Sequence, residues 1–140
     1  MDTLVFDADD QIAGRLATRA AKEILKGKRV IIINAEKAVI SGNPTYIINT
    51  YRAKVQKGDP YKGPFYPRTP DRLLRRIVRG MLPKRPRGRA AYRKLEVYKG
   101  KPAGLGLKDE AILRPIETSN TLEHKFITLG NLSRHIGGKG

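Results

Sequence analysis

The hydrophobic pattern of the first 33 residues predicts a strand, a helix and a second strand. Leu4–Phe6 is a short apolar run, and Val30–Ile33 is a continuous β-branched run, typical of a strand buried on both faces. Between them, apolar pairs recur every four positions, at Ile12/Ala13, Leu16/Ala17, Ala20/Ala21 and Ile24/Leu25. This recurrence has the period of a helix. The order of elements predicts a βαβ unit with a parallel pair of strands.

The residues that flank this first helix predict where it begins and ends. We expect Asp9 or Asp10 to cap its start, because a short carboxylate accepts hydrogen bonds from the free N–H groups of the first turn. We expect Gly27 to end it, because glycine tolerates positive φ.

Two more helices are predicted before residue 83. Asn43-Pro44 favours a helix start, since asparagine caps and proline suits the first helical position. Gly58 would end that helix, and its buried stripe would consist of Ile47, Ile48, Tyr51 and Val55. Thr69-Pro70-Asp71 predicts the next start by the same reasoning, and Pro83 stops that helix after about Leu82.

The remaining patterns are shorter and weaker. Residues 37–40 and 95–98 are compatible with short extended segments, and residues 112–116 with a strand at a sheet edge, because Pro115 cannot donate a ladder hydrogen bond. We expect short helices around residues 90–92 and over residues 129–136, and a mobile tail at 137–140. A chain of 140 residues with these elements is interpreted as a single domain, residues 1–140.

Charge is concentrated in the middle of the chain. Residues 52–101 hold seventeen of the 29 lysines and arginines and three acids, a net charge of +14 out of +16. The two flanking parts are nearly neutral. So concentrated a charge disfavours the compact state through self-repulsion unless a polyanion neutralises it. Nucleic acid is therefore the first candidate partner.

The third predicted helix carries two stripes. Leu73, Leu74, Ile77, Val78, Met81 and Leu82 form an apolar one, while Arg72, Arg75, Arg76 and Arg79 follow one another at i, i+3, i+4 and i+7. These arginines project from one side of the helix. A solvated polar face usually alternates the sign of its charges, and arginine matches phosphate oxygens with a planar fork. We therefore favour phosphate binding over a solvated face, and over insertion in a membrane.

The basic loop that follows and the Pro/Gly/aromatic loop 58–68 extend this candidate region. We expect residues 58–68 and 84–94 to be partly disordered before RNA arrives, because nothing in them can form a core. The tyrosines and phenylalanines among the bases could stack on unpaired RNA bases, although local packing is slightly favoured for each. The candidate RNA-binding residues are Arg68, Arg72, Arg75, Arg76, Arg79, Lys84, Arg85, Arg87, Arg89, Arg93, Lys94, Lys99 and Lys101, with Lys54 and Lys62.

Residues 78–100, VRGMLPKRPRGRAAYRKLEVYKG, resemble the signature of a family, that of large-subunit ribosomal protein number thirteen. That signature is an apolar–basic–Gly–Met–Leu–Pro run, a basic spacer and Leu-x-Val-Tyr-x-Gly. The resemblance continues at Asp7-Ala8 with Gly14–Ala17, at Val30–Glu36 and at Ile40–Gly42. The Pro-Arg-Thr-Pro approach to the third helix is similar to the archaeal and eukaryotic branch.

The resemblance implies a three-layer α/β/α domain around a small, mainly parallel four-stranded sheet, with basic loop and helical extensions. It further implies a structural protein of the large ribosomal subunit that binds ribosomal RNA beside neighbouring ribosomal proteins and supports subunit assembly and translation, without catalysis, cofactor or small-molecule substrate. We accordingly expect a cytoplasmic, ribosome-bound protein. A free-standing regulator that binds messenger RNA is the alternative within nucleic-acid binding.

An enzyme is the alternative outside nucleic-acid binding. Asp7-Ala8-Asp9 after a strand resembles the Asp-x-Asp of haloacid-dehalogenase phosphotransferases, in which the first aspartate attacks phosphate with the help of magnesium. That family expects Thr or Val soon after the second aspartate, whereas Asp10-Gln11 follows here. No cysteine is present, and His124 and His135 lack partners at metal-ligand spacing. Helix capping explains the aspartates more simply.

Overall fold

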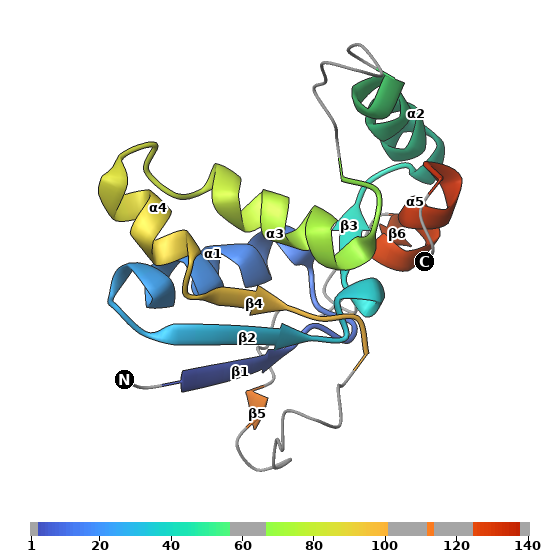
Figure 1. Cartoon of the computed structure of the whole chain (residues 1–140). Helices are drawn as coiled ribbons and strands as arrows, with labels where there is room; N and C mark the ends of the chain where they lie inside the picture. The colour runs from blue at the N-terminus through green and yellow to red at the C-terminus, as the bar shows by residue number, and fades with distance from the viewer. Residues whose placement is uncertain (1–2, 57–66, 101–111, 114–124, 138–140) are drawn as a thin grey trace.

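The computed structural model describes residues 3–56, 67–100, 112–113 and 125–137 (Figure 1). Its larger sheet contains β1 (Thr3–Asp7), β2 (Arg29–Ile33), β4 (Leu95–Val97) and β5 (Ile112–Leu113) in the order β4-β2-β1-β5. Each neighbouring pair is parallel. β1 and β2 pair over their full length, from Thr3 opposite Arg29 to Asp7 opposite Ile33. The α/β class, the parallel βαβ unit and the edge position of β5 are confirmed.

Three helices cover one face of this sheet: α1 (Ala13–Leu25), α3 (Pro70–Gly80) and α4 (Pro86–Tyr92) (Figure 1). α1 packs against α3, α4 and β2, and α3 packs against β4. The core between helices and sheet includes Leu16, Ile24, Leu73, Leu74, Val78, Val30, Ile32 and Leu95. The apolar stripes of α1 and α3 face this sheet, but in the predicted α3 stripe Ile77 is only half-buried, and Met81, just past the end of the helix, is exposed.

The opposite face of the sheet has its own small cluster of buried side chains, Val5, Ile31 and Ile33, with Tyr98 against them. β2 is therefore buried on both faces, as its β-branched run predicts. Within the described residues, the helices that pack on the sheet lie on one face only. The described residues therefore do not form the predicted three-layer α/β/α arrangement, and the connection from β4 to β5, residues 101–111, lies outside them.

A second unit, whose antiparallel sheet was not predicted, lies at one end of the larger sheet. β3 (Val39–Ser41) and β6 (Phe126–Thr128) form a two-stranded antiparallel sheet, flanked by the 3-10 helix η1 (Ala35–Lys37), α2 (Pro44–Gln56) and α5 (Leu129–His135) (Figure 1). Asn43 caps α2 as predicted: its side-chain Oδ1 accepts from the N–H of Thr45 at 2.9 Å. Gly58, the predicted end of α2, lies outside the described residues. The final helix is confirmed.

Aspartate capping of α1 is a wrong prediction. The N-cap is Ile12, whose side chain cannot cap, and the helix begins at Ala13. Asp10 instead has a positive φ of 60° and donates its N–H to the carbonyl of Lys37. Ile12 forms a parallel bridge with Val39. The chain is thus tied to the second unit before the helix can start.

The premise that nothing in residues 84–94 can form a core is also wrong, whereas the short helix predicted around residues 90–92 is confirmed. α4 occupies Pro86–Tyr92, and its Ala91 is buried against the main core. Gly88 is buried so close to Pro83 that a Cβ there would lie 1.8 Å from the Pro83 carbonyl oxygen. The buried residues of this short basic helix are thus two small ones, Gly88 and Ala91. Residues 58–66 lie outside the described residues.

Candidate nucleic-acid interface

The polar side of α3 presents the predicted row of arginines. Leu73, Leu74 and Val78 are buried, whereas Arg72, Arg76 and Arg79 on the other side are exposed. The helix begins after Thr69 with Pro70 at its first position, as predicted, but the Thr69 side chain does not cap it. The row follows from the helical period once the apolar stripe is fixed to the sheet.

This row forms one wall of an open groove of about 580 Å³. All four arginines of the row line it, together with Pro67, Arg68 and Thr69 before the helix and Tyr92 at the end of α4. Five of the fifteen predicted RNA-binding residues therefore converge on one hollow. Five guanidinium groups around a concave surface form a strong anion-binding arrangement, because each can donate a forked pair of hydrogen bonds to phosphate.

Arg75 differs from its neighbours in the row because it is only half exposed. Its guanidinium lies over the Tyr92 ring, with the guanidinium carbon 4.8 Å from the ring centroid. Its Nε is buried and has no hydrogen-bond partner. Arg75 is thus the least exposed arginine of the groove, and the four exposed arginines form what we call its rim.

One carboxylate, Glu96 on β4, lies near this groove and interacts with the positive charge of Arg75. Glu96 forms an ion pair with Arg29 and accepts a hydrogen bond from the Tyr98 hydroxyl at 3.0 Å. The hydrogen bond from Arg29, above all, holds the pKa of Glu96 below its usual range, and the nearby charge of Arg75 acts in the same direction. The hydrogen bond between the Tyr98 hydroxyl and Glu96 raises the pKa of Tyr98, because the phenol donates to a carboxylate. Glu96 is therefore ionised at neutral pH, and Arg29 already offsets its charge.

The bases after α3 extend the positive surface along α4. Lys84 and Arg85 lie in the turn between α3 and α4, Arg87 and Arg89 lie on α4, and Arg93 follows it; all five are exposed, and Lys94 is half-buried. Because Tyr92 on α4 lines the same groove as α3, this basic helix is a neighbour of the groove.

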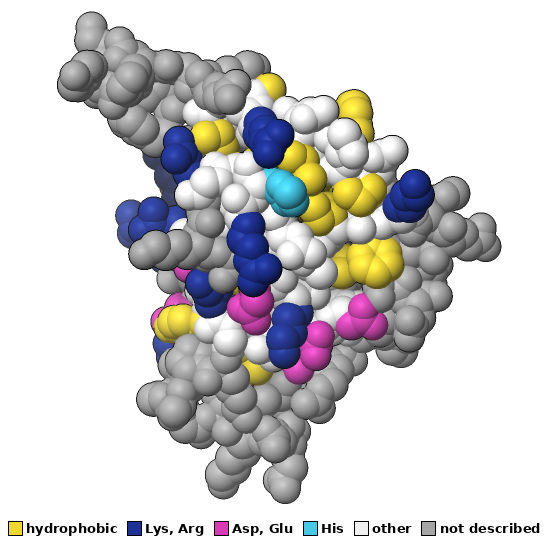
Figure 2. All heavy atoms as spheres, turned by 90° about the vertical axis from the view of Figure 1, so that its right-hand side faces the viewer, with side chains coloured by type: hydrophobic (Ala, Val, Ile, Leu, Met, Phe, Trp, Pro, Cys, Tyr) yellow, Lys and Arg dark blue, Asp and Glu magenta, His cyan; other side chains and the backbone are white. Residues whose placement is uncertain are grey.

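Of the other predicted residues, Lys54 and Lys99 do not line this groove. Lys54 is on α2, which Figure 1 places at the far side of the molecule from α4, and its ammonium lies 4.8 Å from the Tyr51 ring centroid. Lys99 follows β4, and Lys62 and Lys101 lie outside the described residues. On the face that includes α2 and α5, basic side chains are interspersed with hydrophobic and acidic ones (Figure 2). The exposed Tyr46 and Phe126 belong to this second unit.

A second basic groove escaped prediction. It lies beside α1 and is lined by Arg15, Thr18, Arg19, Lys22, Glu23 and Lys28, with Leu4 and Phe6 of β1. Arg15, Arg19 and Lys22 stand at i, i+4 and i+7, the same kind of spacing as on α3. That spacing could have indicated the groove, but the net charge of residues 1–51 is near zero and so gave no sign of a basic surface.

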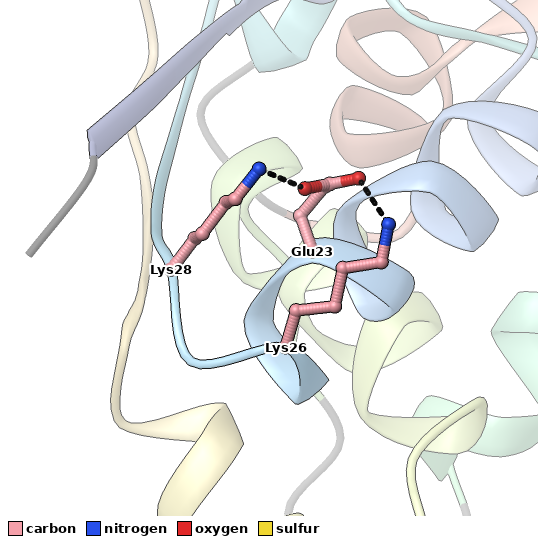
Figure 3. A network of polar contacts seen from close by, with 3 residues as sticks. All are labelled: Glu23, Lys26 and Lys28. Carbon is pink, nitrogen blue, oxygen red and sulfur yellow. Dashed lines mark hydrogen bonds and ion pairs between the residues drawn. The ribbon is translucent and has the colours of Figure 1, made fainter.

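The acid in this second groove is held by two lysines. Glu23 Oε1 lies 3.4 Å from Lys26 Nζ, and Glu23 Oε2 lies 3.2 Å from Lys28 Nζ (Figure 3). The hydrogen bond from Lys28 is the main cause of the lowered pKa of Glu23. Glu23 therefore stays ionised and offsets the two lysines that follow α1.

The Asp-x-Asp segment has a structural role in this geometry. Asp7 is 8% exposed, and its Oδ1 accepts from the N–H of Asp9 and from Asn34 Nδ2, each at 2.9 Å. It thereby ties the turn after β1 to the end of β2. Among the described residues, no three His, Cys, Asp or Glu side chains are grouped so that they could hold a metal ion. None of the described helices has the length and apolarity to cross a membrane.

Comparison with known proteins agrees with the resemblance. The chain matches the family model described as Ribosomal protein L13 over residues 1–104. Three similar proteins are named large ribosomal subunit protein uL13. That of Methanopyrus kandleri is 46% identical over 139 residues, covering 95% of this chain and 86% of the relative. That of Methanocaldococcus jannaschii is 44% identical, covering 96% of this chain and 98% of the relative. That of Archaeoglobus fulgidus is 43% identical, covering 99% and 90%. The chain belongs to the ribosomal protein L13 family.

Proposed function

We propose that this protein is a structural constituent of the large ribosomal subunit that binds its ribosomal RNA and supports subunit assembly and translation. Family membership supports the assignment, since the relatives carry the name of a large-subunit protein. The observation that carries RNA binding is the groove between α3 and α4, where five arginines surround one hollow.

This groove suits recognition of phosphates and RNA shape. Arginine forks fit phosphate oxygens in pairs, and A-form RNA hides most base edges in a narrow major groove. The exposed bases of α4 would extend the contact along an RNA backbone. On this proposal the protein has no catalytic activity, resides on ribosomes in the cytoplasm and lies beside other large-subunit proteins.

Salt dependence tests the groove. Arg72→Ala with Arg79→Ala removes two exposed guanidinium groups from the rim. If each contacts one phosphate, the slope of log affinity against log salt should become shallower by roughly 0.7–0.9 per arginine. A matched control, Lys125→Ala with Arg134→Ala, removes two exposed charges, one just before β6 and one on α5. Equal slopes for both double variants would contradict the groove as the RNA site.

Co-sedimentation tests the assignment to the subunit. In a lysate, the protein should stay with large subunits through a moderate salt wash. Recovery mainly in the free fraction would instead favour a free-standing RNA-binding regulator.

A further inference from the structure

We propose that Tyr92 is a stacking seat for one unpaired base of the bound RNA, and that Arg75 covers the ring until RNA arrives. The inference rests on the proposed function, because it requires the groove between α3 and α4 to bind RNA. It adds that the groove recognises an unpaired nucleotide and not only a row of phosphates.

The position of Tyr92 is the first argument. It is the last residue of α4, it lies half-buried against the main core, and it lines the groove with the arginines of α3. The ring is therefore held by packing and reaches the hollow where phosphates would bind. An aromatic ring beside a row of cations is the usual arrangement for an unpaired nucleotide, whose base stacks while its phosphates are held.

The state of Arg75 is the second argument. Its guanidinium lies over the Tyr92 ring, the position that a stacked base would take. The four other arginines of the groove are exposed, but the Nε of Arg75 is buried without an acceptor. A buried donor without a partner is unfavourable. The cation–π contact with Tyr92 compensates for this only in part.

Binding of RNA would both give Arg75 a hydrogen-bond acceptor and uncover the Tyr92 ring. A phosphate at the rim gives the Arg75 guanidinium an anionic acceptor for its unpaired Nε, whereas the nearby Glu96 carboxylate is already paired with Arg29. When Arg75 moves to that phosphate, the freed face of the Tyr92 ring becomes available to a base. The exchange replaces one cation–π contact with a base–aromatic stack and a charge-assisted hydrogen bond.

The test compares single-stranded RNA with a fully paired duplex, using Tyr92→Leu and Tyr92→Phe. The single strand is a uridine decamer with one 2-aminopurine, whose fluorescence is quenched when it stacks. Tyr92→Leu keeps an apolar side chain against the core but removes the ring. We expect it to bind the single strand about fivefold to hundredfold more weakly, with loss of quenching, while Tyr92→Phe behaves as the original protein. Affinity for the duplex should be unchanged.

Arg75→Ala provides an independent measurement. It should bind with a shallower salt slope, by roughly 0.7 for a single strand, yet still quench 2-aminopurine, because the ring remains. Loss of quenching in this variant, or equal single-strand affinity for Tyr92→Leu and the original protein, would overturn the inference.

The double variant Arg72→Ala with Arg79→Ala distinguishes failure of the stacking proposal from failure of the RNA-binding groove. If that variant weakens binding and Tyr92→Leu does not, the stacking seat is wrong and the groove remains. If neither changes binding, the groove itself is wrong. Circular dichroism on each variant first verifies that it is folded.

Discussion

At the scale of single residues, Glu96 links two neighbouring strands of the larger sheet through an ion pair. It sits on β4, forms the ion pair with Arg29 on β2 and accepts from the Tyr98 hydroxyl. Both partners favour the ionised carboxylate, so its pKa is lowered in the folded protein. The ion pair is partly exposed, with relative side-chain accessibilities of 44% for Arg29 and 33% for Glu96. We therefore expect it to contribute no more than about 1 kcal/mol.

Glu96→Gln should lower stability at neutral pH and not in acid. A lowered pKa stabilises the fold above the unfolded-state pKa of about 4.3, and this contribution is lost as the pH falls through the folded-state pKa. Urea unfolding of both proteins between about pH 7 and pH 3 measures it. The difference in free energy of unfolding should shrink toward zero in acid. A difference that persists unchanged at the lowest pH would show that packing, and not charge, is responsible.

Gly88 is required because α4 touches the turn before it. A Cβ at this position would lie 1.8 Å from the carbonyl oxygen of Pro83, which is backbone and cannot rotate away. Gly88→Ala should therefore destabilise the protein by about 1–3 kcal/mol, the usual cost of overpacking. Gly14→Ala on α1 is the control, since nothing lies within 4 Å of its added Cβ. Chemical denaturation should show a loss for the first variant and none for the second; similar values for both would contradict the close contact.

At the scale of elements, α3 serves the core and the groove with opposite faces. Leu74 is 0% exposed, whereas Arg72 two residues before it is exposed. Leu74→Ala should cost about 2–5 kcal/mol because it leaves a cavity in the core. Arg72→Ala should leave stability within about 0.5 kcal/mol, as is usual at the surface, and weaken RNA binding. Thermal unfolding and RNA titration of both variants measure this division, and a strong stability loss in Arg72→Ala would contradict it.

The most clearly predicted elements are those with a long, regular pattern, although several short elements, such as residues 95–98 and 129–136, were also predicted. α1 and α3 carry unbroken helical stripes, and β2 is a continuous apolar run. β6 has only three residues and pairs with β3 more than eighty positions earlier, so no local pattern indicates it. The capping prediction for α1 was wrong because the bridge between Ile12 and Val39 is a tertiary contact.

In the candidate site too, features set by local spacing could be predicted and features set by tertiary packing could not. The arginine row of α3 follows from spacing alone, because residues three and four positions apart share a helix face. That Tyr92 would lie in the same groove could not be predicted, since this depends on how α4 docks through Ala91 and Gly88. The half-burial of Arg75 likewise depends on the Tyr92 ring above which it lies.

At the scale of the whole molecule, the net charge of +16 opposes folding. Within the described part of the chain, Glu23 pairs with Lys26 and Lys28 and Glu96 pairs with Arg29, and each of these three bases is partly exposed. Exposed arginines such as Arg72 and Arg79 on α3 and Arg87 and Arg89 on α4 contribute to mutual repulsion. Repulsion between exposed charges is long-range in dilute buffer and weak once salt screens it.

Monovalent salt should therefore stabilise the free protein. The screening length falls from about 30 Å at 0.01 M to about 10 Å at 0.1 M, so the melting temperature should rise over that interval. Arg87→Gln with Arg89→Gln, which removes two exposed charges from α4, should melt higher than the original protein at low salt and converge with it at high salt. Calorimetry at constant pH measures both curves. A melting temperature that falls with salt would mean that the ion pairs outweigh the repulsion. The expected rise would show that the cations of the proposed RNA-binding surface destabilise the free protein, so that bound RNA would both neutralise this surface and stabilise the fold.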